Sequence, residues 1–299
     1  MDRPILIFGA SGLLGTHLVR RLAEQGRFPV AIAHNRKAQF PAGVPAYRTP
    51  ITEPEAVRKT MHRYHPAAVI NCAAFTDVDG CERDPGLAAR VNTLGAENIA
   101  RAAKEVGARL VQLSTDYVFD GTAGPGDENA RPHPINVYGK TKHDAETGVR
   151  NADPQSLVIR AASFIGKGPQ DRPSFIEQML ATLRAGKPLR AAIDQIANVT
   201  DVAALAKGIQ AAVEQQMTGV LHVGSRELIS RYDLALLVAE VFGLDPGRVE
   251  PMMHADLGRA ARRPLHGGLI VRKAEQALGW TFPSPREALE NLSGALAQT

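Results

Sequence analysis

The stretch Pro4-Ile-Leu-Ile-Phe-Gly-Ala-Ser-Gly-Leu-Leu-Gly15 decides the fold of this chain. Residues 4–8 are a short, uninterrupted apolar run, which is typical of a strand buried on both faces of a parallel sheet. A turn with the spacing Gly-x-x-Gly-x-x-Gly follows over residues 9–15, and a helix is predicted from there through about Gln25. Glycines let the backbone approach a pyrophosphate closely, and a helix N-terminus offers it N–H groups and a positive dipole. The pattern therefore indicates a dinucleotide site, with a plain tight turn as the alternative.

Strands and helices alternate beyond this turn. Further buried strands are predicted at 29–33, 67–74, 109–115 and 157–165, and helices at 53–65, 85–107 and 138–150. This alternation implies an α/β fold with a Rossmann-type, doubly wound parallel sheet. After residue 166 the pattern loosens, and we expect helices at 174–185, 201–215, 231–242, 272–278 and 285–296, with short strands at 220–223 and 248–251. The chain thus divides into a dinucleotide-binding Rossmann domain over residues 1–165, to which the helix near 201–215 returns, and a smaller mixed α/β substrate-binding domain over 166–299.

Composition excludes several classes of protein. An apolar share of 44% and a charged share of 22% are ordinary for a soluble globular chain. The net charge is only +4 and the cations are scattered, so we do not expect nucleic-acid binding. No apolar stretch approaches the ~20 residues of a membrane span, and the first strand begins too early for a signal peptide. Two cysteines and nine unclustered histidines indicate neither a disulfide framework nor a metal site, so we expect a reduced cytoplasmic protein without a metal.

A hydroxyl, a phenol and an ammonium group occur in a spacing that suits carbonyl reduction. The predicted strand 109–115 ends in Ser114 and Thr115, and the following helix carries Tyr138 and Lys142. Because the two helix residues are four apart, their side chains lie on one face. A tyrosine has a pKa of ~10, and a lysine cation beside it favours the tyrosinate that proton transfer leaves behind. We expect the phenol to protonate a carbonyl oxygen while hydride reaches its carbon, although Tyr-x-x-x-Lys alone also fits a solvated helix face.

The turn after the second strand indicates which dinucleotide binds. In NAD-binding chains an acidic residue about twenty positions after the glycines binds the ribose 2′-hydroxyl. This chain has Asn35, Arg36 and Lys37 there, and the two cations suit a 2′-phosphate instead. We therefore predict a preference for NADPH over NADH, with a solvated basic turn as the alternative.

Several stretches carry a family resemblance that covers nearly the whole chain. They are 71–79 (Asn-Cys-Ala-Ala-Phe-Thr-Asp-Val-Asp), 114–121 (Ser-Thr-Asp-Tyr-Val-Phe-Asp-Gly), 136–142 (Asn-Val-Tyr-Gly-Lys-Thr-Lys), 194–195, 200–201 and 262–264. With the glycine turn, they resemble the extended short-chain dehydrogenase/reductases, and among them the dTDP-4-dehydrorhamnose reductases. The resemblance implies NADPH-dependent reduction of a 4-keto group on a nucleotide-activated deoxysugar, and at family level a homodimer.

The resemblance also implies roles for the matching positions. Thr115 would hold the substrate carbonyl, Tyr138 would be the general acid, and Lys142 would bind the nicotinamide ribose and tune Tyr138. The residues expected at the cofactor are Gly9, Ser11, Gly12, Leu13, Leu14, Gly15, Asn35, Arg36, Cys72, Ala73, Ala74, Asn92, Ser114, Tyr138 and Lys142. Those expected at the substrate are Thr76, Val78, Asp116, Phe164, Gln195, Arg262 and Arg263.

The two arginines form a candidate clamp for a nucleoside diphosphate, because guanidinium forks bind phosphate bidentately. A solvated basic loop is the alternative for Arg262 and Arg263.

Three features of the sequence bear on the predicted function. Tyr117 stands where related sugar-nucleotide 4,6-dehydratases carry a glutamate acid/base, which disfavours a dehydratase. Rhamnose-pathway reductases place a tryptophan after the sixth strand, where this chain has only Phe164 nearby, so we expect a different sugar pocket. Stretches 138–142 and 219–225 also resemble the regulatory β subunit of methionine adenosyltransferase. A non-catalytic NADP-binding subunit and a reductase of another carbonyl substrate therefore remain alternatives.

Overall fold

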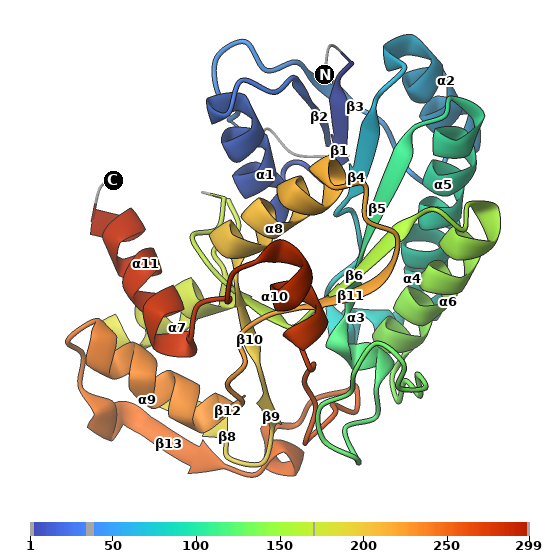
Figure 1. Ribbon diagram of the computed structural model, residues 1–299. Helices are drawn as coiled ribbons and strands as arrows, with labels where there is room; N and C mark the ends of the chain where they lie inside the picture. The colour runs from blue at the N-terminus through green and yellow to red at the C-terminus, as the bar shows by residue number, and fades with distance from the viewer. Residues whose placement is uncertain (1–2, 34–38, 170, 298–299) are drawn as a thin grey trace.

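A parallel sheet forms the centre of the computed structural model, which describes residues 3–33, 39–169 and 171–297 (Figure 1). Within these residues the sheet has seven strands in the order β11-β6-β5-β4-β1-β2-β3. The strands are β1 (Ile5–Phe8), β2 (Pro29–Ala33), β3 (Ala46–Arg48), β4 (Ala68–Asn71), β5 (Arg109–Thr115), β6 (Leu157–Ala161) and β11 (Gly219–Val223). Every neighbouring pair is parallel. The doubly wound parallel sheet predicted from the sequence is confirmed.

Helices cover both faces of the sheet and explain why its central strands are apolar throughout. Ile5 and Ile7 of β1 belong to a core shared with α1 and α8, whereas Leu6 and Phe8 belong to a second core shared with α2, α5 and α6. Successive side chains of a strand point to opposite faces, so a strand between two helical layers buries every residue. These helices are α1 (Leu13–Glu24), α8 (Val202–Glu214), α2 (Pro54–Tyr64), α5 (Gly95–Glu105) and α6 (Val137–Ala152).

A second group of elements packs below the sheet in Figure 1 around a core of its own, which includes Ile176, Leu234 and Leu289. It contains α7 (Phe175–Arg184), β8 (Leu189–Ala192), α9 (Arg231–Val241), β13 (Val249–Met252) and α11 (Pro285–Ala297). β8 and β13 pair in parallel, and β12 (Ile229–Ser230) pairs antiparallel with β9 (Ile196–Ala197). This is the smaller mixed α/β part that the sequence predicts. The chain does not stay within it, because α8 returns to α1 and α10 (Arg272–Leu278) packs against β11.

Several elements differ from those predicted. Strand 220–223, expected among the elements of the smaller part, is β11 at the edge of the central sheet. The strand predicted at 157–165 is two strands, because β7 (Ser163–Ile165) leaves the sheet to pair with β10 (Val199–Asp201). The helix predicted at 85–107 is α4 (Pro85–Ala88), a π-helix (Ala89–Leu94) and α5. The sequence analysis missed α3 (Val78–Arg83), β3 and β8, which are short and lack a continuous apolar run. No helix in the described ranges is long and apolar enough to cross a membrane.

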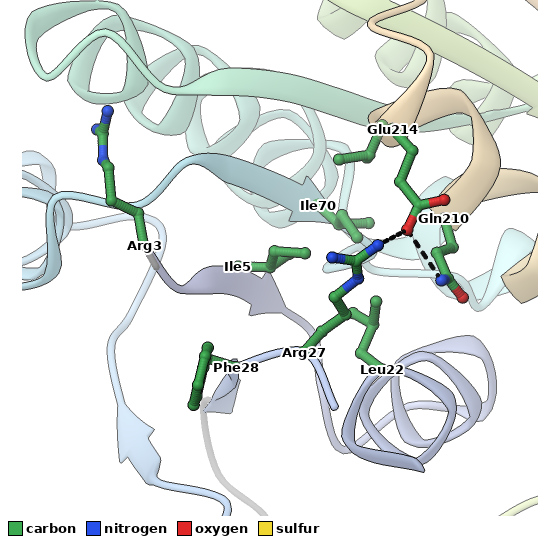
Figure 2. Close-up of a pocket in the computed structure, with 9 residues that line it drawn as sticks. Arg3, Ile5, Leu22, Arg27, Phe28, Ile70, Gln210 and Glu214 are labelled. Atoms are coloured by element: carbon green, nitrogen blue, oxygen red, sulfur yellow. Dashed lines mark hydrogen bonds and ion pairs between the residues drawn. The ribbon is translucent and has the colours of Figure 1, made fainter. Parts of the chain in front are cut away.

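A small pocket lies at the amino-terminal side of the sheet, between α8 and the residues that precede β1 and β2 (Figure 2). Arg27 and Glu214 point toward one another there, with Nη2 and Oε1 2.5 Å apart, and Gln210 also bonds to Glu214. The pocket volume is about 10 Å³, which is room for a single water molecule. A dinucleotide does not fit here, and the glycine turn predicted to bind one lies at the opposite, carboxyl edge of the sheet.

Candidate active site

The glycine turn joins β1 to α1 at the carboxyl edge of the sheet. Gly9 has a φ of +77°, which glycine adopts without strain, and a Cβ there would lie 2.6 Å from the backbone nitrogen of Ala73. A Cβ on Gly15 would overlap the Gly9 carbonyl, whereas one on Gly12 would meet only the Gly9 oxygen, at 3.3 Å. Among the described residues no side chain caps α1 at Gly12. The first-turn N–H groups of a twelve-residue helix are thus open to an anion, and this cradle fits the pyrophosphate of a dinucleotide.

The carboxyl end of β4 forms the neighbouring wall. Cys72 donates its N–H to Phe8 at 2.9 Å, and Asn71 accepts a hydrogen bond from Ala73 at 3.0 Å. Burial raises the pKa of the Cys72 thiol to about 12, so this side chain stays neutral. Ser11, Leu13 and Leu14 of the turn and Ala74 after β4 lie at the same edge, as expected for cofactor residues. Asn35, Arg36 and Lys37 lie outside the described residues.

Asn92 sits in the π-helix and holds the loop after β4. Its Oδ1 accepts from the N–H of Phe75 at 2.7 Å, and its Nδ2 donates to the Phe75 carbonyl at 3.2 Å and to Thr141 at 3.1 Å. A π-turn often marks a functional site, because the extra residue redirects a side chain. Asn92 therefore joins the β4 loop to the helix that carries Tyr138 and Lys142, and its side chain is engaged by the protein itself.

α6 brings Lys142 against β5. Asn136 caps the helix by accepting from the N–H of Gly139 at 2.7 Å, and a Cβ on Gly139 would overlap the Tyr117 carbonyl. Lys142 is 3% exposed and donates from Nζ to the Leu113 carbonyl at 2.6 Å. Burial lowers the pKa of Lys142 to about 8, since the charged form is costly inside the protein.

Tyr138 lies one helical turn before this lysine, and its ring packs edge-on against Tyr117 with centroids 6.0 Å apart. Burial raises the pKa of Tyr138 above its ordinary value, the charge of Asp116 adds to the rise, and a hydrogen bond with Thr115 opposes it. The phenol is thus neutral at neutral pH and available as an acid. The sequence predicts that Lys142 favours the tyrosinate, and in this structure burial is the largest influence on the pKa of Tyr138.

Thr115, Asp116 and Tyr117 end β5 directly beside the phenol. Thr115 donates from Oγ1 to Asp116 at 3.1 Å and accepts from the N–H of Tyr117 at 3.2 Å. Burial raises the pKa of Asp116 to about 6, with the positive charge of Arg231 opposing the rise. Gln195 donates to the Tyr117 hydroxyl at 3.3 Å. The predicted residues Thr115 and Asp116 at the end of β5, Tyr138 of α6 and Gln195 before β9 therefore lie together at the carboxyl edge of the sheet.

The remaining residues predicted at the substrate are more dispersed. Thr76 is exposed after β4 and accepts from Arg172 at 3.1 Å, Val78 opens α3, and Phe164 lies half-buried in β7. Arg263 forms a bidentate pair with Asp79 of α3, with N–O distances of 3.1 and 3.0 Å.

Arg262 is exposed, and its carbonyl accepts from Asn136 at 2.8 Å. The Arg263 guanidinium, one half of the expected diphosphate clamp, is thus engaged by a carboxylate of the protein.

Arg231 is a residue of this edge that the sequence analysis missed. It begins α9, stacks its guanidinium 5.3 Å from the Phe175 ring centroid and donates to the Ser163 hydroxyl at 2.5 Å. Burial raises the pKa of both Asp116 and Tyr117, and the charge of Arg231 opposes that rise in each. The sequence contains no local signal for this, because an arginine at the first position of a helix is ordinary. A cation from the smaller part of the protein therefore faces the end of β5.

Comparison with known proteins identifies the relatives of this chain. The family model described as "RmlD substrate binding domain" matches residues 3–297. The chain is 33% identical over 294 residues to the "Probable low-salt glycan biosynthesis reductase Agl14" of Haloferax volcanii, covering 97% of each chain. It is 35% identical over 279 residues to the dTDP-4-dehydrorhamnose reductase of Mycobacterium tuberculosis, covering 90% of this chain and 85% of the relative. The structure of dTDP-4-dehydrorhamnose reductase from Bacillus anthracis in complex with NADP has a TM-score of 0.85 and 28% identity, covering 100% of both chains.

Proposed function

Because the chain belongs to the RmlD substrate binding domain family, we propose that it reduces the 4-keto group of a dTDP-activated deoxysugar with hydride from NADPH. One observation carries the proposal: the hydroxyl of Thr115 bonds to the phenol of Tyr138, and the buried ammonium of Lys142 lies one helical turn further along α6. The dTDP-4-dehydrorhamnose reductase relatives support the substrate class, and the NADP complex of a structural neighbour supports the cofactor.

In the proposed reaction the chain's own groups bind the reactants and move one proton. The turn 9–15 holds the pyrophosphate on the N-terminus of α1, and bound NADPH supplies the hydride. The Thr115 hydroxyl, whose one hydrogen is donated to Asp116 in this structure, turns that hydrogen to the 4-keto oxygen and orients it. Tyr138 gives its phenolic proton to that oxygen, and the Lys142 cation stabilises the phenolate that remains. A positioned proton donor of this kind contributes roughly 10²–10⁴-fold in rate.

The sugar and its diphosphate would lie between β5 and the smaller part. Asp116, Tyr117 and Gln195 supply polar groups for the sugar, and Arg231 supplies a cation that faces them. Arg262 remains a candidate for the diphosphate, whereas Arg263 has to release Asp79 before it serves as a clamp. The division into a cofactor-binding part over 1–165 and a substrate-binding part over 166–299 is part of this proposal.

Turnover with a defined substrate panel tests the proposal. Protein, NADPH and a set of nucleotide-linked 4-keto-sugars are mixed, and the loss of nicotinamide absorbance is followed. We expect oxidation of NADPH with dTDP-4-keto-6-deoxysugars and little with the corresponding ketone lacking a nucleotide. Absence of hydride transfer to every substrate, together with tight NADPH-dependent binding to a partner protein, would instead support the regulatory alternative. The homodimer and the cytoplasmic location stay predictions, the former tested by light scattering of the purified protein.

A further inference from the structure

A buried ion pair lies one helical turn beyond Lys142. Glu146 of α6 accepts from Arg160 of β6 at both oxygens, with Nε–Oε1 at 2.9 Å and Nη2–Oε2 at 2.7 Å. The two side chains are only 5% and 4% exposed. A bidentate pair in this setting fixes its geometry firmly, because breaking it would leave a buried charge without a partner.

Glu146 and Lys142 attach to consecutive residues of β5. Lys142 donates to the Leu113 carbonyl at 2.6 Å, and the next residue, Ser114, donates its hydroxyl to Glu146 at 2.5 Å. Since the two helix residues are four apart, they lie on the same face of α6 and reach the same strand. The ammonium and the carboxylate thus bind adjacent residues at the end of β5, and the charge of Glu146 acts on Lys142.

His222 of β11 contacts Arg160 on the side away from Glu146. Its Nε2 lies 3.3 Å from Nη1 of Arg160, and its Nδ1 lies 3.1 Å from the Gly126 carbonyl. Arginine only donates, so Nε2 is the acceptor and Nδ1 carries the hydrogen. Burial and the charge of Arg160 lower the pKa of His222 to about 4, which keeps the ring neutral. Arg160 is therefore held by Glu146 on one side and by His222 on the other. Because His222 is neutral, Glu146 is the anion of this group that acts on Lys142.

The charges around Lys142 come from few groups. Burial opposes its ammonium, and the Glu146 carboxylate is the charged group that favours it most. Tyr138 lies on the same helix face with Asp116 beyond it, Arg160 stands behind the carboxylate, and His143 contacts Glu146 at 3.7 Å. Burial alone would raise the pKa of Glu146, but the nearby His143 ring, the hydrogen bonds from Arg160 and Ser114, and the charge of Arg160 hold it at about 2. Glu146 is therefore an anion at every pH at which Lys142 titrates.

We propose that Glu146 is a positioning residue that keeps Lys142 charged and aligned, with its own carboxylate fixed by Arg160 and Ser114. It does not touch the reacting atoms and acts through the lysine. Its kinetic consequence rests on the reductase function proposed above, whereas its effect on the lysine exists in the protein without substrate or cofactor.

Direct titration of Lys142 tests the assignment. Protein labelled with ¹³C at lysine Cε is titrated by NMR, and the Lys142 signal is identified by its loss in Lys142→Met. We expect Glu146→Gln to lower the Lys142 pKa by about one pH unit or more, because burial persists and the favourable anion is gone. The matched control is Asp144→Asn on the exposed face of α6, where Asp144 pairs with Lys140 at 3.0 Å. This control makes the same carboxylate-to-amide change and should leave the Lys142 pKa unchanged.

A second variant guards against misfolding. The double change Glu146→Gln/Arg160→Gln leaves no unpaired buried charge, and we expect its Lys142 pKa to lie between those of wild type and Glu146→Gln. With substrate, the alkaline limb of kcat should move to lower pH in Glu146→Gln, whereas simple loss of folded protein lowers kcat equally at every pH. An unchanged Lys142 pKa in either folded variant overturns the proposal. A lowered pKa in a protein whose wild type transfers no hydride contradicts the reductase function and leaves the role of Glu146 standing.

Discussion

At the scale of single residues, the site places ionisable groups where burial opposes their charged forms. Lys142, Tyr138 and Asp116 each have burial as the largest influence on the pKa. For the phenol this keeps the transferable proton in place, and for the lysine it makes the charge depend on a neighbouring anion. The chemistry of the site therefore depends on which polar partners surround each group.

Removal of the Tyr138 hydroxyl should separate binding from chemistry. Tyr138→Phe deletes one oxygen from a packed ring, so we expect NADPH affinity within a few-fold of wild type and a loss of roughly 10²–10⁴ in reduction rate. Pre-steady-state hydride transfer to a 4-keto-sugar nucleotide measures the rate. Tyr117→Phe is the control, because its hydroxyl bonds to Gln195 and its loss should slow the reaction far less. An unchanged rate in Tyr138→Phe would remove this phenol as the acid.

Exchange of one basic residue should alter cofactor choice. Arg36 lies outside the described residues, and its role rests on the absence of an acidic residue after the second strand. We expect NADPH to bind more tightly than NADH, and Arg36→Glu to move the preference toward NADH, because a carboxylate repels a 2′-phosphate and accepts from a 2′-hydroxyl. Calorimetric titration with both cofactors measures this. Arg58→Glu on α2 has the same charge change at an exposed site and should leave the ratio unaltered. Equal affinities in wild type would contradict the prediction.

At the scale of elements, two local units carry the cofactor edge. The unit β1–turn–α1 needs glycine because the backbone of the turn packs against the β4 loop and against itself. The π-helix at 89–94 places Asn92 between that loop and α6. Each unit joins a strand end to a helix, so a change in either should affect the site more than the core.

A side chain in the glycine turn should block NADPH without unfolding the protein. At Gly12 the first added carbon meets only the Gly9 oxygen, at 3.3 Å, so the rest of a valine projects into the space in front of α1. We expect Gly12→Val to abolish NADPH binding, which is measured by fluorescence quenching. The circular dichroism spectrum of the variant should match that of the wild type. Gly294→Ala in α11, where an added carbon meets nothing within 4 Å, is the control and should bind normally. Normal binding by Gly12→Val would mean that the turn is only structural.

At the scale of the whole molecule, polar contacts join the β4 loop to the C-terminal half. Arg172 donates a hydrogen bond to the Thr76 hydroxyl. Asp79, in α3 just after this loop, accepts from the Arg263 guanidinium and, at 2.9 Å, from the N–H of Ala261. Charged groups therefore join the two halves of the chain here, in addition to the packing of α8 on α1 and of α10 on β11.

Loss of the Asp79 carboxylate should destabilise the protein measurably. Asp79→Asn removes the carboxylate that pairs with the mostly buried Arg263 guanidinium, which keeps its hydrogen bond to the Ala261 carbonyl, and we expect a loss of about 1–3 kcal/mol in urea unfolding. Burial would raise the Asp79 pKa, but the Ala261 N–H and Arg263 hold it below the ordinary value. The stabilisation is therefore present above the unfolded pKa of ~3.9 and is lost as the pH falls through the lower folded value.

In Asp79→Asn this acid dependence should diminish. Glu55→Gln, in an exposed pair with Arg58 at 3.4 Å, should cost little and is the control. Equal stability of Asp79→Asn and wild type at neutral pH would show that the pair contributes nothing.

The parallel sheet, the glycine turn and the spacing of Tyr138 and Lys142 follow from the order of residues alone. These features are local: a strand buried on both faces is a continuous apolar run, and residues four apart share a helix face. The turn 9–15 and the helix from Asn136 therefore lie where the chain predicts. The roles proposed for the site residues are still predictions, since they await the experiments above.

The pairing of residues far apart in the chain depends on the folded arrangement. The partners in Glu146–Arg160, Arg263–Asp79 and Arg231 with Asp116 come from separate elements, and no local period relates their positions. The same holds for β11, whose five residues fit either part of the chain until hydrogen bonds to β6 place it in the sheet. A buried charge needs a partner from the protein, because water is excluded from the interior. That partner can belong to any element that the fold places beside the charge. That requirement acts across the folded chain, and a sequence read in order does not reveal it.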